Sequence, residues 1–479
     1  MATVNYNTLI PNNVNLSTDR RLQRALEQWH PKFLNWWLHQ GPRDFQTHEV
    51  YLRTAIGVDR SNWAKFGFVR MPDYRWGILL APAVDDRKIP FGEHKGSPVW
   101  HEVPGEYRGL IKRLLVVQGD TEPASVEQQR FLGHTAPSLY DMRNLFQVNV
   151  EEARHLWAMV YLLHKYFGRD GREEAEALLE RTSGDADKPR ILGAFNEETP
   201  DWLSFFLFTS FTDRDGKMQL ECLAQSGFDP LSRTCRFMLT EEAHHMFVGK
   251  SGVERILTRT CEAMNDAGIS DPTDAGAIRA LGVMDLPMIQ RKMNFHFSVT
   301  LDLFGSEIST NAANAFTAGI KGRFHEVDLA DDHQLLNDNY PLLQNVDGKL
   351  VTNQVPAISA INARLVDDYI ADCEKIVVAW NKTIARSNID FALSLPHRGF
   401  NRQIGGFAGL NVTPVGNIVN DTGWAAAGAD YLPSQEDLAY ILSLMKATLT
   451  TGEYASWIAP PKNGVGGKPG DFEYVRITT

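Results

Sequence analysis

Two nearly identical pentapeptides constrain this chain more than any other feature of its sequence. Glu-Glu-Ala-Arg-His occupies residues 151–155, and Glu-Glu-Ala-His-His occupies residues 241–245. Each contains Glu-x-x-His, and on a helix that spacing places a carboxylate and an imidazole on neighbouring turns of one face. A single copy is common by chance and usually marks a surface ion pair, so the repetition is the informative fact.

Both copies lie on apolar helix faces. A seam with three- and four-residue spacing passes through each copy, and its members are Leu145, Val148, Glu152, His155, Met159, Leu162 and Tyr166 in the first and Met238, Glu242, His245 and Ile256 in the second. Ionisable groups that face a core must be paired, neutralised or bound to metal, because an isolated buried carboxylate costs several kcal/mol or more. A metal centre would satisfy all of these groups together.

Di-iron carboxylate bundles take Glu-x-x-His from each of two helices and one carboxylate from each of two others. Ligands at equal height on antiparallel neighbours should be separated by similar lengths of chain in both halves. The interval from Glu122 to Glu152 and the interval from Asp213 to Glu242 match within one residue. This match favours Glu122 and Asp213 as the remaining ligands.

Two nearby carboxylates compete for these positions. Asp120 in place of Glu122 would lengthen the first interval, and Asp215 in place of Asp213 would shorten the second. Either one spoils the match between the halves, so they are disfavoured without being excluded. Pro123 directly follows one favoured carboxylate and predicts a kink or bulge in that helix, since proline lacks an amide donor.

The predicted donors also indicate the kind of metal. Four carboxylates and two ferrous ions give a nearly neutral site, which is compatible with burial. Two imidazoles argue against magnesium, whereas manganese remains compatible with the ligand types. Gln118 stands one turn before Glu122, within reach of a metal or substrate, although a hydrogen bond within the helix is an equal alternative. Glu151 and Glu241 are expected to be either solvated or supports for the ligands, and Arg154 is expected to be structural.

Composition excludes several other classes of protein. The 479 residues are 43% hydrophobic and 22% charged, which is typical of a globular chain able to bury a sizeable core. A net charge of −11 argues against nucleic acid as a partner. Four scattered cysteines without a CxxC pair support neither a disulfide framework nor a cysteine-bound iron–sulfur cluster. Without a signal-like segment or an apolar run of about 20 residues, we expect a cytoplasmic protein with no membrane span.

Patterning divides the chain into three expected regions: an N-terminal helix with an irregular aromatic-rich segment (1–105), a di-iron four-helix bundle (106–263), and a helical and loop-rich extension packed on the bundle (264–479). Further helices are expected at 17–37, 278–294, 356–387 and 435–450. The predicted fold class is mainly α, a ferritin-like four-helix bundle with additional helices and irregular N- and C-terminal extensions.

The sequence resembles the oxygenase components of benzoyl-CoA 2,3-epoxidases, ferritin-like di-iron enzymes of aerobic aromatic degradation. The resemblance runs over most of the chain. It rests on the segment 118–122, the two Glu-Glu-Ala-x-His motifs, Asp213 in its Phe-rich helix, and the N-terminal tryptophans Trp36, Trp37, Trp63 and Trp76. The resemblance implies two iron ions held by Glu122, Glu152, His155, Asp213, Glu242 and His245, in agreement with the spacing.

The resemblance also implies a reaction and its partners. One oxygen atom of O2 would enter the 2,3 bond of the benzoyl ring of benzoyl-CoA, and the other would leave as water. The two electrons would come from a separate NADPH-dependent flavin/iron–sulfur reductase, since the chain has no GxGxxG fingerprint of its own. The CoA phosphates require cations, for which three clusters compete: Arg20, Arg21 and Arg24; Arg291 and Lys292; or Lys321 and Arg323.

Three other functions remain open from the sequence. The same ligands would serve a di-iron oxygenase for another aromatic acyl-CoA, such as a phenylacetyl thioester. A radical-generating subunit resembling that of ribonucleotide reductase would need a tyrosine close to the metals. A non-catalytic metal-binding bundle would not need the large part of the chain outside the four helices, which favours a substrate pocket and a docking site for a reductase.

Overall fold

The computed structural model describes residues 2–43, 48–71, 73–462 and 475–477. It is mainly helical, as predicted. The α-helices are α1 (Arg20–Gln40), α2 (Arg108–Gln128), α3 (Leu139–Glu180), α4 (Trp202–Ala224), α5 (Asp229–Ala267), α6 (Ala275–Arg279), α7 (Leu286–Leu301), α8 (Thr310–Thr317), α9 (Ile361–Arg386), α10 (Asp421–Ala427) and α11 (Gln435–Leu444). The strands are β1 (Ala2–Thr3), β2 (His48–Val58), β3 (Ala64–Arg70), β4 (Asn339–Val346), β5 (Lys349–Pro356) and β6 (Val475–Ile477).

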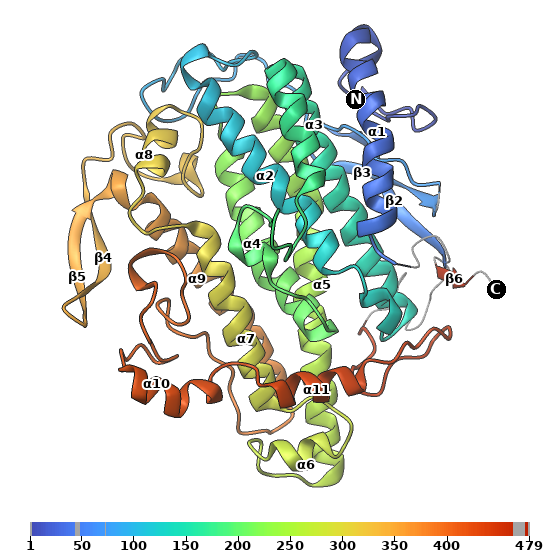
Figure 1. The fold of residues 1–479 in the computed structure, drawn as a ribbon, viewed down its shortest axis with the longest axis vertical. Coiled ribbons are helices and arrows are strands. Elements are labelled where there is room, and N and C mark those ends of the chain that lie inside the picture. The colour runs from blue at the N-terminus through green and yellow to red at the C-terminus, as the bar shows by residue number, and fades with distance from the viewer. Residues whose placement is uncertain (1, 44–47, 72, 463–474, 478–479) are drawn as a thin grey trace.

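Helices α2 to α5 form the bundle at the centre of the molecule (Figure 1). Local signals set their ends: Ser138 caps α3 by accepting a hydrogen bond from the backbone of Asp141, and Gly268 ends α5 in the left-handed conformation. Gly168 also has a positive φ inside α3 and divides it into two helical stretches. From Leu139 to His164 nearly every residue of α3 is buried, because other elements cover it on all sides.

Helices α4 and α5 approach each other closely at two glycines. A Cβ atom on Gly249 would lie 2.5 Å from the backbone nitrogen of Ser210, and one on Gly252 would overlap the ring of Phe206. Only glycine lets the two backbones come this near. The pair of helices is therefore held at a separation that a side chain at either position would increase.

The N-terminal region forms a layer beside α3, on the right in Figure 1. Helix α1 packs on α3, and the antiparallel strands β2 and β3 lie against the same helix, with β1 and β6 both paired to β2. The helix expected at 17–37 is confirmed as α1. The region after it was expected to be irregular, but it contains β2, a strand of 11 residues. This sheet covers the part of α3 that carries the first motif.

The C-terminal region packs on the other side of the bundle, where α7 and α9 contact α4 and α9 also contacts α5 (Figure 1). The helix predicted at 356–387 corresponds to α9. The single helix predicted at 278–294 was wrong in its boundaries: α6 ends at Arg279 and α7 begins at Leu286, with Gly282 at a positive φ between them. The last helix is also shorter than predicted and ends at Leu444.

One continuous apolar core joins the bundle to α1, α7 and α9. All four cysteines are buried and unpaired, which agrees with the absence of a disulfide framework. Among the described residues, no helix is both long and apolar enough to cross a membrane.

Candidate metal centre

The six residues predicted as ligands lie together in the middle of the bundle. Each helix contributes to the cluster: Glu122 from α2, Glu152 and His155 from α3, Asp213 from α4, and Glu242 and His245 from α5. None is more than 6% exposed, and both histidines are fully buried. The two imidazole rings lie 6.1 Å apart between centroids. The sequence repeat thus corresponds to two facing helices at the same height in the bundle.

The two histidines present the same nitrogen to the cluster. His155 Nδ1 lies 3.2 Å from Glu122 Oε2 and 3.5 Å from Glu242 Oε1. His245 Nδ1 lies 3.2 Å from Glu152 Oε1 and 3.7 Å from Asp213 Oδ2. The donor atoms therefore form two groups, each compact enough to hold one ion. One group is Glu122, Glu152 and His155, and the other is Glu152, Glu242 and His245. Glu152 belongs to both groups, so it could serve as a ligand in either one.

The other nitrogen of each histidine is held by the opposite motif. His155 Nε2 is 2.9 Å from Glu241 Oε2, and His245 Nε2 is 3.1 Å from Glu151 Oε2. These contacts fix both rings with Nδ1 toward the cluster. Sequence reasoning left the roles of Glu151 and Glu241 open. They are 1% and 2% exposed, so the solvated alternative was wrong.

Two arginines neutralise these supporting carboxylates. Arg154 Nε donates to Glu241 Oε2 over 2.7 Å, and Arg53 Nε, from strand β2, donates to Glu151 Oε1 over 2.8 Å. Arg154 is structural, as expected, but it acts next to the centre. The contribution of Arg53 was missed, because nothing in the sequence relates this strand residue to a helix that comes much later in the chain.

The electrostatics of the cluster favour a cation. Burial and the charges of Glu122 and Glu242 raise the pKa of Glu152 well above its ordinary value, and burial with the same neighbours raises the pKa of Asp213 to about 8. Burial lowers the pKa of His155, but its hydrogen bonds to Glu122 and Glu241 outweigh this and raise it to about 10. Without a metal, protons must therefore compensate the crowded negative charge.

Two atoms of the cluster also lack partners. Within the described part of the chain, neither Asp213 Oδ2 nor His245 Nδ1 makes a hydrogen bond of good geometry, although both are buried. Buried polar atoms are rarely left unsatisfied unless an ion or a water completes them. A set of four carboxylates and two imidazoles, with orphaned atoms on facing helices, fits a pair of transition-metal ions.

The competing carboxylates make other contacts. Asp120 accepts hydrogen bonds from Arg181 and Arg190 and has a structural role. Asp215 accepts a hydrogen bond from Gln219 and lines a cavity beside the cluster. Helix α2 continues through Pro123 to Gln128, so the proline does not end the helix, and the kink or bulge expected there stays a prediction.

Gln118 contacts the cluster directly. Its Nε2 donates to Glu122 Oε1 over 2.9 Å, so the expected hydrogen bond within the helix is formed with a predicted ligand. Gln118 also lines the cavity of about 150 Å³ that lies beside the cluster, between α2 and α4. Both alternatives raised for this residue, a structural bond and a position near a substrate, are therefore compatible with its place.

Comparison with known proteins gives one close relative. Benzoyl-CoA oxygenase component B of Aromatoleum evansii is 59% identical to the chain over 474 residues, which cover 99% of this chain and 100% of the relative. No protein-family model matches the chain.

Proposed function

The chain belongs to the benzoyl-CoA oxygenase component B family, and we propose that it is the di-iron subunit that inserts one oxygen atom of O2 across the 2,3 bond of the benzoyl ring of benzoyl-CoA. The observation that carries the proposal is the buried cluster of four carboxylates and two histidines. The membership supports an oxygenase, and the cluster supports a metal centre as its reactive part.

The residues of the cluster would bind two iron ions as two sets of ligands. Glu122, Glu152 and His155 would hold one ion, and Glu152, Glu242 and His245, with Asp213 beside them, would hold the other. When bound, such a pair of ions supplies the activation of O2 by two electrons.

Residues around the cluster prepare it for that chemistry. Glu151 and Glu241 keep each imidazole in the tautomer and orientation in which Nδ1 is free to bind. Gln118 holds the carboxylate of Glu122 at the edge of the adjacent cavity. Burial of the six predicted ligands and of Glu151 and Glu241 keeps water away from the reacting atoms and strengthens the charge interactions among them.

The adjacent cavity is suited to an aromatic ring. Apolar side chains line much of it, among them Leu114, Val117, Leu192, Phe195 and Leu303. Its volume of about 150 Å³ equals that of an engineered apolar cavity that binds benzene. A ring held there would lie next to Gln118, one hydrogen bond away from the predicted ligand Glu122.

The electrons require a partner. Conversion of the ring, O2, two electrons and two protons into an epoxide and water balances only with an external reductant, and the sequence has no dinucleotide fingerprint. The relative's name describes one component of an oxygenase. We propose that the partner is a flavin/iron–sulfur reductase that draws on NADPH.

The test is product analysis with isotopically labelled O2. The iron-loaded protein, reduced chemically, is incubated with benzoyl-CoA, and the acyl ring is analysed by mass spectrometry beside a metal-stripped control. We expect one labelled oxygen per ring, only with metal. Oxygen consumption without label in the ring would refute benzoyl-CoA as the substrate and direct the trials to other aromatic thioesters, while absence of oxygen consumption would refute the oxygenase assignment.

The ligand assignment has its own test. Glu152→Ala and His245→Ala should each lower the metal content and abolish turnover, because each removes a donor from the second group of ligands. Glu173→Ala is the matched control, since Glu173 lies on α3 but is exposed and forms a salt bridge with the exposed Arg169. Full metal content together with full turnover in either ligand variant would overturn the assignment.

A further inference from the structure

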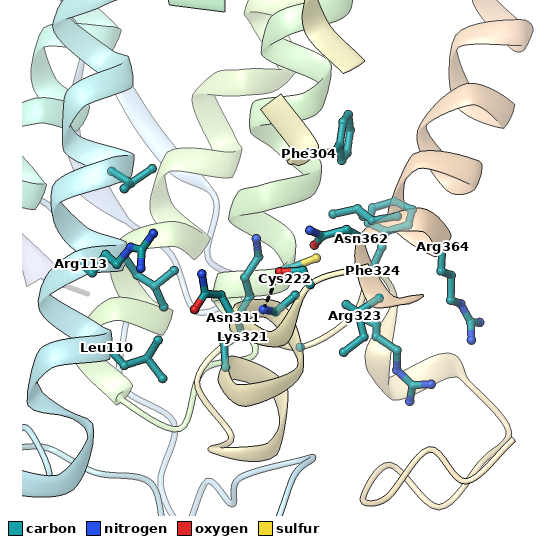
Figure 2. Close-up of a pocket in the computed structure, with 18 of the residues that line it drawn as sticks. Leu110, Arg113, Cys222, Phe304, Asn311, Lys321, Arg323, Phe324, Asn362 and Arg364 are labelled. Carbon is teal, nitrogen blue, oxygen red and sulfur yellow. Dashed lines mark hydrogen bonds between the residues drawn. The ribbon is translucent and has the colours of Figure 1, made fainter. Parts of the chain in front are cut away.

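The cavity beside the cluster adjoins a larger one. The outer cavity has a volume of about 290 Å³ and is lined by residues of α2, α8, α9 and the segment 321–324 (Figure 2). Leu114, Val117, Leu192 and Lys321 line both cavities. The two cavities are therefore neighbours that share a wall, and Gln118, which hydrogen-bonds to the predicted ligand Glu122, lines the inner one.

Basic side chains surround the outer cavity. Arg113 extends from α2 and Arg364 from α9, while Lys321 lies between the two helices (Figure 2). Neither Arg113 nor Arg364 forms a salt bridge or a side-chain hydrogen bond within the described residues. Lys321 donates to the neutral side chain of Gln219 over 2.5 Å. Three positive charges thus surround one opening of a chain whose net charge is −11.

The remaining charges of the lining do not cancel these three. Arg323 is already paired with Glu326 and Asp331, so it adds no free charge. Asp368 is the carboxylate in the lining, and burial raises its pKa while Arg364 opposes that effect. Asp368 beside Arg364 and Asp215 beside Lys321 offset part of this charge, and an excess of positive charge remains on Arg113, Arg364 and Lys321.

The other cation clusters suggested by the sequence are less suitable. Arg291 pairs with Asp437, and the buried Lys292 pairs with Asp201, so both serve the fold. The arginines at 20, 21 and 24 are exposed on α1, which lies across the bundle from α8 and α9 (Figure 1). Of the three clusters, the one containing Lys321 and Arg323 lines the outer cavity, and Lys321 also lines the inner cavity beside Gln118.

We propose that the outer cavity binds the phosphate-bearing part of an acyl-CoA thioester, with Arg113 and Arg364 contacting phosphate oxygens and Lys321 marking the passage to the inner cavity. Guanidinium groups that form no salt bridge within the described residues suit phosphates, because their paired N–H donors match the oxygens. The apolar side chains of Leu110, Leu114 and Phe324 would accompany the uncharged arm that leads to the ring. This assignment rests on the proposed function for the identity of the acyl group.

The test measures binding of coenzyme A and of pantetheine, which lacks the phosphates, to the metal-loaded full chain by calorimetry. Arg113→Gln and Arg364→Gln should each weaken coenzyme A binding by about 10-fold or more, because each removes a charge-assisted hydrogen bond. Pantetheine binding should not change. Arg113→Lys keeps the charge and should recover part of the affinity. Arg24→Gln, from the exposed cluster on α1, is the matched control and should bind both compounds as the wild type does.

Kinetics separate binding from catalysis. In both cavity variants KM for benzoyl-CoA should rise by the factor lost in binding, while kcat at saturating substrate and the metal content stay unchanged. Wild-type affinity for coenzyme A in both variants would overturn the proposal, and so would an equal loss for pantetheine. Binding of coenzyme A that depends on Arg113, without labelled oxygen in benzoyl-CoA, would keep this site and refute the proposed function instead.

Discussion

Substitution of Gly249 tests whether the close approach of α4 and α5 sets the geometry of the metal centre. A Cβ atom there would lie 2.5 Å from Ser210 N and from Thr209 Oγ1, and 2.6 Å from Phe206 O. Two of these are backbone atoms, which cannot rotate away. Since ordinary contacts of a Cβ begin near 3.4 Å, Gly249→Ala must move the helices apart locally by roughly 1 Å.

The consequences reach the ligands within one helical turn. His245 lies four residues before Gly249 on α5, and Asp213 lies three residues after Ser210 on α4. Metal sites keep their distances to within about 0.2 Å, so a shift of roughly 1 Å is several times the tolerance. Overpacking costs about 1 to 3 kcal/mol, and the better helix propensity of alanine offsets about 1 kcal/mol of that.

We therefore expect Gly249→Ala to lose up to about 2 kcal/mol of unfolding free energy and a large part of its metal-binding capacity. Urea denaturation of the metal-free protein measures the first, and metal analysis after loading measures the second. Gly109→Ala is the matched control: Gly109 is also in a helix, but its Cβ would meet nothing within 4 Å, so metal content should stay full. Unchanged stability and iron content in Gly249→Ala would refute the reasoning.

Three further predictions concern charge. Glu241→Gln removes the anion that holds His155 Nε2 and should lower iron affinity by about 10- to 100-fold, measured by competition with a chelator, while Glu173→Gln on the surface of α3 should not. Iron affinity of the wild type should rise with pH through neutrality, because the metal must displace protons from Asp213 and His155. Burial raises the pKa of Asp213 to about 8, and the carboxylate partners of His155 raise its pKa to about 10. An affinity independent of pH between 6.5 and 8.5 would contradict this prediction. Asp437 accepts hydrogen bonds from Arg279 and Arg291, which outweigh burial and lower its pKa to about 2. A depressed pKa stabilises the fold at pH values above the unfolded pKa near 3.8, and the effect is lost as pH falls toward 2. Asp437→Asn should therefore cost about 2 kcal/mol of unfolding free energy at pH 7, and its difference from the wild type should shrink as the pH is lowered. A difference in unfolding free energy that is constant at all pH values would contradict this prediction.

Helical periodicity explains how much of the centre could be predicted. Glu152, His155, Glu242 and His245 were found because a repeated Glu-x-x-His on an apolar face converts spacing along the chain into position on a helix. Glu122 and Asp213 needed a comparison between the two halves of the bundle. The structure brings all six together, and their role as ligands remains a prediction that metal analysis can test.

Long-range contacts explain what could not be predicted. Glu151 lies one position off the apolar seam, and it is buried only because β2 covers that side of α3 and supplies Arg53. The hairpin of β4 and β5 was also missed, although Asp347 and Gly348, both at positive φ, join the strands as a two-residue turn that Asp-Gly favours. The burial of Glu151 could be predicted only by knowing where β2 packs, whereas the hairpin could have been predicted from its Asp-Gly turn alone.

The crossed contacts between the motifs have a consequence for how the protein could be divided. Cut between α3 and α4, the chain would give two helical hairpins, each with one histidine whose steering carboxylate belongs to the other piece. Neither fragment could orient its own imidazole, so we expect neither to bind iron with the affinity proposed for the whole chain. Both imidazoles are oriented only when the two hairpins have packed together, so iron uptake should report correct assembly of the bundle.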